Sequence, residues 1–216
     1  MVALLEFLRQ RELSNSMAIA ILDYGSGNLR SALRAFEQSG RDVVLTSDYS
    51  VALEADGLVV PGVGAFGACM QGLKSVRGDE LVRERAEKGR PTIGICVGMQ
   101  IFFAQGVEHG THVGVGIWPA TVEKLEAKVL PHMGWNTVDA APGSQLFKGV
   151  EGESFYFVHS YAVRAKIDNN SLQTWTDYDQ RFLAAIEDGV ISATQFHPEK
   201  SGDAGLHLIK NWVSTL

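Results

Sequence analysis

Cysteine is scarce in this chain of 216 residues, which contains only Cys69 and Cys96. Two cysteines are far too few for a disulfide framework, and so low a content is typical of proteins of the reducing cytosol. No pair of cysteines or histidines has the spacing of zinc ligands, so we expect no metal site. The composition therefore predicts a cytoplasmic protein that is held together by its core.

Positive charge and long apolar runs are also in short supply. The formal net charge is −6, and the Lys and Arg residues are scattered along the chain instead of clustered. A nucleic-acid-binding protein needs a basic stripe to displace the counterions of the phosphates, so we exclude that class. No apolar run approaches the length of a membrane span, and we expect no membrane segment.

The first 16 residues lack the features of a secretory signal. Their sequence, MVALLEFLRQRELSNS, is interrupted by four charged residues at positions 6, 9, 11 and 12 and has no small-residue cleavage site. We interpret residues 1–16 as an N-terminal extension. Residues 17–216 show no repeat and no linker, and 45% of the chain is hydrophobic, so we expect one domain there.

The first half of the chain alternates apolar runs with helical patterns. Strands are expected at 18–22, 42–45, 57–60 and 91–95, and helices at 28–39 and 79–88. Continuous apolar runs of this kind are typical of strands buried on both faces of a parallel sheet. The third run is expected to stop at Pro61. This rhythm predicts an α/β fold with a mainly parallel, doubly wound sheet.

In the second half of the chain, the apolar runs are shorter and are separated by turns. Short strands with turns between them are expected at 112–125, 134–139, 154–164, 172–176 and 182–196, followed by a final helix at 203–216. Such a series favours additional antiparallel strands that close over the sheet.

The stretch GICVGMQ, residues 94–100, places Cys96 between two glycines at the end of a strand. One interpretation is a small buried hydrophobe, because free cysteines are usually buried and inert. The other is a nucleophile. Gly94 and Gly98 resemble the glycines of a nucleophile elbow, and the following helix N-terminus favours a thiolate. Ligands of doubly wound sheets also bind at the carboxyl ends of strands.

A thiolate nucleophile needs a base and a group that orients the base, and QFHPEKS, residues 195–201, offers both. If residues 197–199 are extended, the side chains of His197 and Glu199 lie on the same side. A carboxylate in that position fixes the imidazole tautomer and stabilises its cation, as in an acyl-transfer triad. The alternative is that His197 is an ordinary core histidine beside a turn.

An oxyanion hole requires backbone amides near the nucleophile. The candidates are Val97, directly after the cysteine, together with Val63 and Gly64 of the stretch PGVG, although that stretch could equally be a simple β-turn. Cys69 is expected to pack in a core. Four further histidines, at positions 109, 112, 132 and 207, are expected at the surface or in turns.

Together, GICVGMQ, PGVG and HPEKS resemble the motifs of class I glutamine amidotransferases, from Met17 to the C-terminus. The resemblance implies a flavodoxin-like three-layer fold and no cofactor. It also implies hydrolysis of glutamine to glutamate and ammonia through a γ-glutamyl thioester, with Cys96 as nucleophile, His197 as base and acid, and Glu199 as orienting carboxylate. The substrate-binding residues that it implies are Gly62, Gln100, His159, Ser160 and Tyr161.

Four stretches, DYGSGN at 23–28, HMGWN at 132–136, FYFVHSY at 155–161 and QFHPEKS, are similar to the glutaminase subunit of imidazole glycerol phosphate synthase. This resemblance implies a heterodimer with a (β/α)8-barrel cyclase subunit. That subunit receives the ammonia and makes imidazole glycerol phosphate and aminoimidazole carboxamide ribotide in histidine biosynthesis. The interface positions that it implies are Asn28, Arg34, Met133, Trp135, Tyr156 and Lys200. The alternative for Met133 and Trp135 is a place in the core.

Other functions compete with this one. DYGSGN resembles half of a dinucleotide fingerprint, but Arg30 stands where the third glycine belongs, which argues against a nucleotide cofactor. The chain could be a class I glutaminase that serves another synthase, such as those for vitamin B6, anthranilate or guanylate. It could also be a catalytically silent binding module on the same fold.

Overall fold

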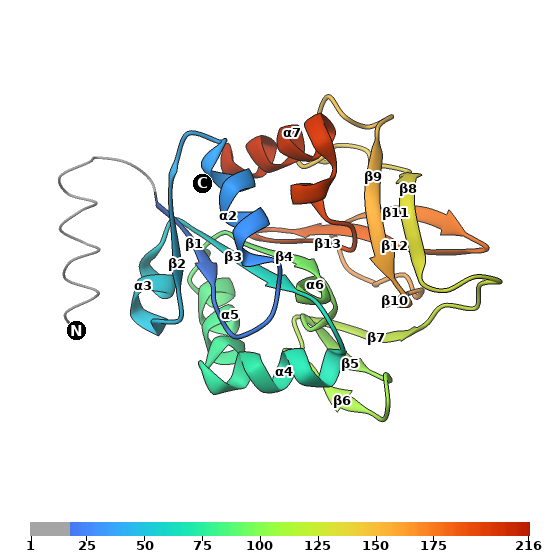
Figure 1. Ribbon diagram of the computed structural model, residues 1–216, viewed down its shortest axis with the longest axis horizontal. Coiled ribbons are helices and arrows are strands. Elements are labelled where there is room, and N and C mark those ends of the chain that lie inside the picture. The colour runs from blue at the N-terminus through green and yellow to red at the C-terminus, as the bar shows by residue number, and fades with distance from the viewer. Residues whose placement is uncertain (1–17) are drawn as a thin grey trace.

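The computed structural model describes residues 18–216, and Figure 1 shows their arrangement. The extension expected at residues 1–16 lies outside the described residues, as does Met17. Within the described part of the chain, no helix is long and apolar enough to cross a membrane.

A seven-stranded sheet forms the centre of the molecule, in the order β11-β12-β13-β4-β3-β1-β2. Its strands are β1 (Ala18–Leu22), β2 (Asp42–Thr46), β3 (Gly57–Gly62), β4 (Thr92–Cys96), β11 (Leu172–Tyr178), β12 (Gln180–Asp188) and β13 (Ile191–Thr194). The five strands from β13 to β2 are parallel, and β12 and β11 add antiparallel pairs at one edge. The predicted mainly parallel sheet with antiparallel strands from the C-terminal half is confirmed.

Helices cover both faces of this sheet and give three layers (Figure 1). On one face α2 (Leu29–Glu37) contacts α7 (Gly202–Val213), and on the other α5 (Gly78–Glu87) contacts both α3 (Tyr49–Glu54) and α4 (Phe66–Ser75). The helix starts follow from local chemistry, since the side chain of Asp48 accepts hydrogen bonds from the first amides of α3.

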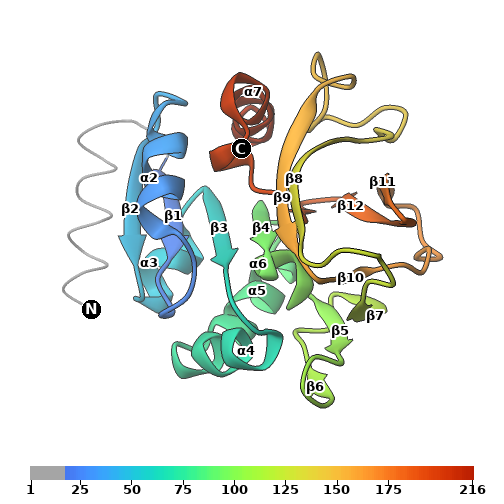
Figure 2. The same cartoon turned by 45° about the vertical axis from the view of Figure 1, so that its right-hand side comes forward.

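Two smaller sheets stand beside the central one (Figure 2). The first has the order β10-β7-β5-β6, made of β5 (Phe103–Gly106), β6 (His112–Val113), β7 (Trp118–Lys124) and β10 (Tyr161–Val163). The second is an antiparallel ribbon of β8 (His132–Thr137) and β9 (Ser154–His159). Figure 2 shows that this ribbon passes over the carboxyl-terminal end of the central sheet, where β4 ends.

Two sequence expectations for the sheet are wrong. β3 does not stop at Pro61 but continues to Gly62, because β1 pairs with β3 only as far as Val59 and a proline beyond that point is tolerated. The run expected as one strand at 182–196 is a hairpin. Gly189 adopts a φ of 60° at its turn, and β13 pairs antiparallel with β12 on one side and parallel with β4 on the other.

Candidate active site

Cys96 occupies a strained turn between strand β4 and the short helix α6 (Val97–Gln100). Its backbone has φ 57° and ψ −114°, which a residue with a side chain seldom adopts, and its side chain is almost fully buried. Such strain persists only where the surroundings impose it, and it is concentrated at functional sites. The turn directs the thiol to the carboxyl end of the sheet, as in a nucleophile elbow.

The neighbouring glycines are explained by close backbone contacts. A Cβ atom on Gly98 would lie 1.9 Å from the carbonyl oxygen of Val60, and one on Gly94 would lie 2.7 Å from the carbonyl oxygen of Gly98. Gly62 is opposite Cys96 in the register of β3 and β4, and its Cβ would lie 2.4 Å from the amide nitrogen of Gly98. The elbow therefore fits against β3 only without side chains at these positions.

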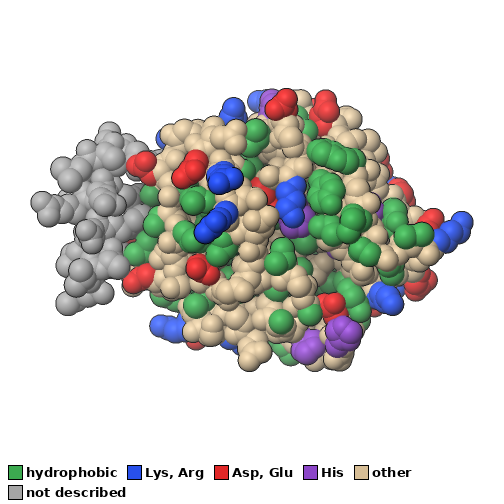
Figure 3. Space-filling view, in the orientation of Figure 1, with side chains coloured by type: hydrophobic (Ala, Val, Ile, Leu, Met, Phe, Trp, Pro, Cys, Tyr) green, Lys and Arg blue, Asp and Glu red, His purple; other side chains and the backbone are tan. Residues whose placement is uncertain are grey.

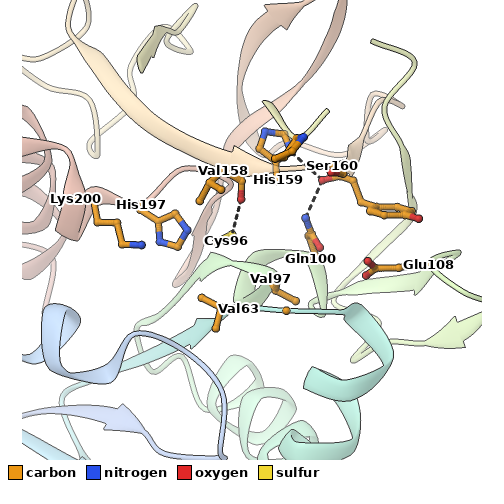
Figure 4. A pocket seen from close by; sticks show the side chains of 13 residues that line it. Val63, Cys96, Val97, Gln100, Glu108, Val158, His159, Ser160, His197 and Lys200 are labelled. Carbon is orange, nitrogen blue, oxygen red and sulfur yellow. Dashed lines mark hydrogen bonds between the residues drawn. The ribbon is translucent and has the colours of Figure 1, made fainter. Parts of the chain in front are cut away.

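His197 and Glu199 form a buried pair next to Cys96. His197 Nδ1 lies 2.7 Å from Glu199 Oε1, and the two side chains are 2% and 3% exposed. The extended conformation considered for residues 197–199 from the sequence is not found. Pro198–Lys200 is a 3-10 turn, and this turn brings the carboxylate back to the ring. Because the carboxylate accepts a hydrogen bond at Nδ1, the Nε2 atom faces away from it, and Figure 4 shows the ring beside Cys96.

The charge state of His197 depends on its two neighbours. Burial by itself would lower the pKa of the imidazole, but Cys96 and the Glu199 carboxylate outweigh burial and raise this pKa to about 10. Nε2 of His197 has no hydrogen-bond partner within residues 18–216. A buried imidazolium whose second nitrogen is unoccupied can hold a proton for a reacting group.

A cavity of about 290 Å³ opens in front of Cys96 (Figure 4). Ten of the predicted site residues line it: Val63, Gly64, Cys96, Val97, Gln100, His159, Ser160, Tyr161, His197 and Lys200. The volume suits a small substrate such as an amino acid. Glu199 lies behind His197 instead of facing this cavity, and Gly62 packs against the elbow, so neither is part of the lining.

Gln100 presents one particular atom to the cavity. Its Nε2 donates to the carbonyl oxygen of Tyr161 at 2.8 Å and to Oε1 of Gln195 at 3.0 Å, which uses both amide hydrogens. The carbonyl oxygen Oε1 therefore remains as the acceptor of this side chain. A ligand that meets Gln100 has to supply a donor.

The N–H groups predicted to form the oxyanion hole differ in whether they already donate a hydrogen bond. The N–H of Val63 donates to the hydroxyl of Ser26 at 3.1 Å, and the carbonyl of Val63 accepts from that hydroxyl at 2.8 Å and from the Cys69 thiol at 3.2 Å. In this conformation the N–H of Val63 is not available to an anion above Cys96. Val97 is the first residue of α6, so its N–H has no partner within the helix. Cys69 is buried, as predicted.

His159, which lines the cavity, forms a buried pair with His132 behind it. His159 Nδ1 lies 3.0 Å from the carbonyl oxygen of Tyr161, and its Nε2 lies 3.1 Å from Nδ1 of His132. Burial lowers the pKa of His159 to about 3 and that of His132 to about 4, so both rings are neutral. The expectation that His132 lies at the surface is wrong, because its ring is stacked on Tyr178 in the aromatic core.

The predicted interface residues come from the strands β8 and β9, from helix α2 with its N-cap, and from the 3-10 turn after His197. Met133 and Trp135 point outward from β8 and are 62% and 59% exposed, so neither is a core residue. The Trp135 ring lies 6.1 Å from that of Tyr156 on β9. Arg34 and Lys200 are exposed, and Asn28 caps α2 through the amide of Ser31. Figure 3 shows hydrophobic side chains gathered on the face that β8 and β9 form.

Sequence reasoning missed one charged residue of the cavity. Glu108 lies on its wall after β5, and its Oε2 accepts from the N–H of Phe66 at the start of α4. The carboxylate is thereby held at the N-terminus of α4, where it satisfies one of the free amides of the helix. No local motif marks this residue, since only the tertiary fold brings the loop after β5 next to Cys96. Within the described residues, no group of three or more His, Cys, Asp or Glu could hold a metal ion.

The elbow thiol, the imidazole–carboxylate pair and the central parallel sheet together define a class of enzymes with a cysteine nucleophile. The model of the family described as "Glutamine amidotransferase class-I" matches residues 20–216, and the chain belongs to this family. Solved structures agree on the fold: a crystal structure of a glutamine amidotransferase covers 90% of this chain and 98% of its own, with a TM-score of 0.72 and 18% identity. PurLQS from Thermotoga maritima covers 93% and 99%, with a TM-score of 0.70 and 18% identity.

Curated relatives narrow the class. The protein named "Imidazole glycerol phosphate synthase subunit HisH" of Corynebacterium diphtheriae is 58% identical over 207 residues, which is 92% of this chain and 99% of the relative. The proteins of the same name from Mycobacterium bovis and Streptomyces avermitilis are 57% and 53% identical, over 92% and 95% of this chain and 98% and 100% of theirs. Within the class, the chain therefore belongs with the HisH subunits.

Proposed function

We propose that this chain hydrolyses glutamine to glutamate and ammonia and passes the ammonia to the cyclase subunit of imidazole glycerol phosphate synthase, in histidine biosynthesis. The observation that carries the proposal is the buried His197–Glu199 pair, held beside a strained cysteine at the mouth of a cavity. The relatives named HisH, at 53 to 58% identity, support the choice of pathway. The proposal includes a cytoplasmic location, one catalytic domain over residues 17–216, and no cofactor.

The chemistry follows from the three side chains. The Cys96 sulfur attacks the side-chain amide carbon of glutamine while His197 gives its Nε2 proton to the leaving nitrogen, which departs as ammonia. The acyl group is then a thioester of Cys96. His197 next takes a proton from water, whose oxygen attacks the thioester carbon, and the C–S bond breaks to release glutamate. Glu199 holds the imidazole in one tautomer and stabilises its cation throughout.

The cavity offers a partner for each end of the substrate. The free acceptor on Gln100 and the carboxylate of Glu108 suit the donors of a glutamine, its ammonium group included. The segment of His159, Ser160 and Tyr161 lines the opposite wall, and Gly62 keeps β3 close to the elbow. The oxyanion formed at the amide carbon is stabilised by the amides of Val97 and Gly64, and Val63 joins them only after leaving Ser26.

The partner surface is the exposed face of β8 and β9 with its surroundings. Met133 and Trp135 are large, apolar and exposed, the kind of side chain that anchors an interface, and Tyr156, Arg34 and Asn28 complete the set. Lys200 is exposed and also lines the cavity, so it lies between substrate and partner. A (β/α)8-barrel cyclase docked there receives ammonia before water can protonate it.

The deciding experiment measures glutamate release from glutamine by the purified chain, with and without the cyclase and its ribonucleotide ligand. We expect strong stimulation by the liganded cyclase and a loss of at least about 10³-fold in Cys96→Ser, whose fold and partner binding remain. Glu199→Gln should lose part of the activity, because the carboxylate orients the base without taking part in bond changes.

Each of the other outcomes would contradict part of this proposal. Hydrolysis that ignores this cyclase but responds to the synthase of vitamin B6, anthranilate or guanylate would move the chain to that pathway. No hydrolysis under any condition, together with no labelling of Cys96 by a glutamine-like affinity reagent, would leave a silent binding module. Full activity of Cys96→Ser would exclude Cys96 as the nucleophile.

A further inference from the structure

Gln195 lies directly behind Cys96, on the side of the thiol away from the cavity. Its side chain is 1% exposed, and its Nε2 lies 3.8 Å from the Cys96 sulfur, within the range of a hydrogen bond to sulfur. Its Oε1 accepts from Gln100 at 3.0 Å, and its backbone N–H donates to Ala184. The mechanism above gives this buried amide no role.

The direction in which the Gln195 amide points is set from a distance. The carbonyl oxygen of Tyr161 can only accept a hydrogen bond, so Gln100 must turn its NH2 group toward it. The second hydrogen of that NH2 group meets Oε1 of Gln195. The Gln195 amide then has its donor end toward the sulfur. One main-chain carbonyl thus orients two side-chain amides in series.

The charges around the Cys96 sulfur determine how much a hydrogen-bond donor such as the Gln195 N–H adds to the stability of the thiolate. The titratable groups that face Cys96 or line its cavity are His197 with Glu199, Tyr24, Cys69, His159, Tyr161, Glu108 and Lys200. Burial raises the pKa of Tyr24 and of Cys69 and lowers that of His159, so these three groups are neutral at pH 7. His197 is the buried cation of this set, and Lys200 is solvated.

We propose that Gln195 is a further catalytic residue, whose side-chain N–H stabilises the thiolate of Cys96 and whose orientation is maintained by Gln100 and the Tyr161 carbonyl. The role rests on the proposed function, in which Cys96 is the nucleophile. Because Gln195 approaches the sulfur from behind the cavity, bound glutamine does not displace it. The same N–H favours the sulfur as leaving group when the thioester is hydrolysed.

The test is the rate of Cys96 alkylation by iodoacetamide between pH 5 and pH 10, without glutamine or cyclase. Peptide mass spectrometry separates Cys96 from the buried Cys69. The full-length chain is compared with Gln195→Met, which has no donor, and with Gln195→Glu, which places a carboxylate beside the sulfur. Gln173→Met is the matched control, since Gln173 is a partly buried glutamine that bonds to Ile167, remote from the site.

We expect the midpoint of the alkylation profile to rise by about 0.5–1 pH unit in Gln195→Met, as for the loss of one hydrogen bond of ordinary strength, and by more in Gln195→Glu. Gln173→Met should match the unmodified chain. Gln100→Leu leaves Gln195 in place but removes its orienting partner, so it should shift the midpoint in the same direction by less. When Gln100→Leu is combined with Gln195→Met, the midpoint should be the same as in Gln195→Met alone.

An unchanged midpoint in folded Gln195→Met and Gln195→Glu would overturn the inference. If neither variant folds, Gln100→Leu decides, and an unchanged midpoint there has the same meaning. The alkylation needs no turnover, so this failure is distinct from failure of the proposed function. Failure of the proposed function would be seen if the unmodified chain hydrolysed no glutamine even with the liganded cyclase.

Discussion

At the scale of single residues, one hydrogen-bond acceptor organises much of the site. The carbonyl oxygen of Tyr161 accepts from Gln100 on one side and lies 3.0 Å from Nδ1 of His159 on the other. The hydrogen at Nδ1 makes Nε2 of His159 an acceptor, so His132 must donate to it. Burial lowers the pKa of both rings and keeps them neutral, in contrast to His197, whose partner is a carboxylate.

The neutral pair predicts an acid-labile fold. Buried His132 and His159 have pKa values lowered to about 4 and about 3, against an unfolded value near 6.5. The unfolded chain therefore binds more protons below about pH 6.5, and the free energy of unfolding falls as the pH falls toward 4. His132→Phe keeps the stacking on Tyr178 and removes one titration. Urea unfolding at pH 7.0 and 4.5 should show a smaller loss in this variant.

The exposed His207 provides the comparison for that measurement. His207→Gln should lose as much stability between the two pH values as the unmodified chain. An equal loss in His132→Phe would mean that other groups govern the acid sensitivity.

At the scale of elements, the site depends on how closely helix α6 approaches strand β3. Gly98 of α6 faces the Val60 carbonyl of β3, and Gly62 of β3 faces Gly98 in return. The approach allows the turn to aim Cys96 at the cavity while the strands keep their register. The backbone strain at Cys96 is thus maintained by packing of elements far apart in sequence.

Gly98→Ala tests this packing directly. The added Cβ would lie 1.9 Å from a main-chain oxygen, which cannot move without disturbing the central sheet. We expect the free energy of unfolding to fall by about 1–3 kcal/mol, the usual cost of overpacking, with loss of glutaminase activity. Gly152→Ala is the control, since nothing lies within 4 Å of its Cβ. Urea denaturation should find the control within about 0.5 kcal/mol of the unmodified chain, and a similar result for Gly98→Ala would contradict the argument.

At the scale of the whole molecule, the ribbon of β8 and β9 joins two functions. Its inner residues, His132, Phe157 and His159, are buried beside the cavity, while Met133 and Trp135 point outward. This alternation is the ordinary period of a strand. The ribbon thus places the proposed partner surface and the back of the cavity only one strand thickness apart.

Trp135→Ala should weaken the complex with the cyclase about tenfold or more, because an exposed tryptophan at the centre of an interface is a frequent hot spot. Calorimetric titration of the cyclase measures this change. Leu45→Ala is the control, since Leu45 is an exposed apolar residue on the edge strand β2, away from the ribbon. If both variants bind as the unmodified chain does, the partner surface lies on another face.

Elements that rest on short-range patterns follow from the amino-acid sequence alone. The apolar runs of β1, β3 and β4 predict a parallel sheet because only strands buried on both faces are apolar at every position. The motifs around Cys96 and His197 were likewise readable, since a glycine-flanked cysteine and a histidine–proline–glutamate run each occupy a few consecutive residues.

How these strands and motifs are brought together depends on tertiary packing. No local signal distinguishes β13 from the antiparallel strands, because its parallel pairing is with β4, whose residues lie about 100 positions earlier in the chain. The same holds for Glu108, Gln195 and His132. Nothing in the neighbouring sequence shows what each of these side chains contacts, because their partners lie 27 to 99 positions away. Local patterns specify local structure, whereas a site assembled from many strand ends is defined by packing.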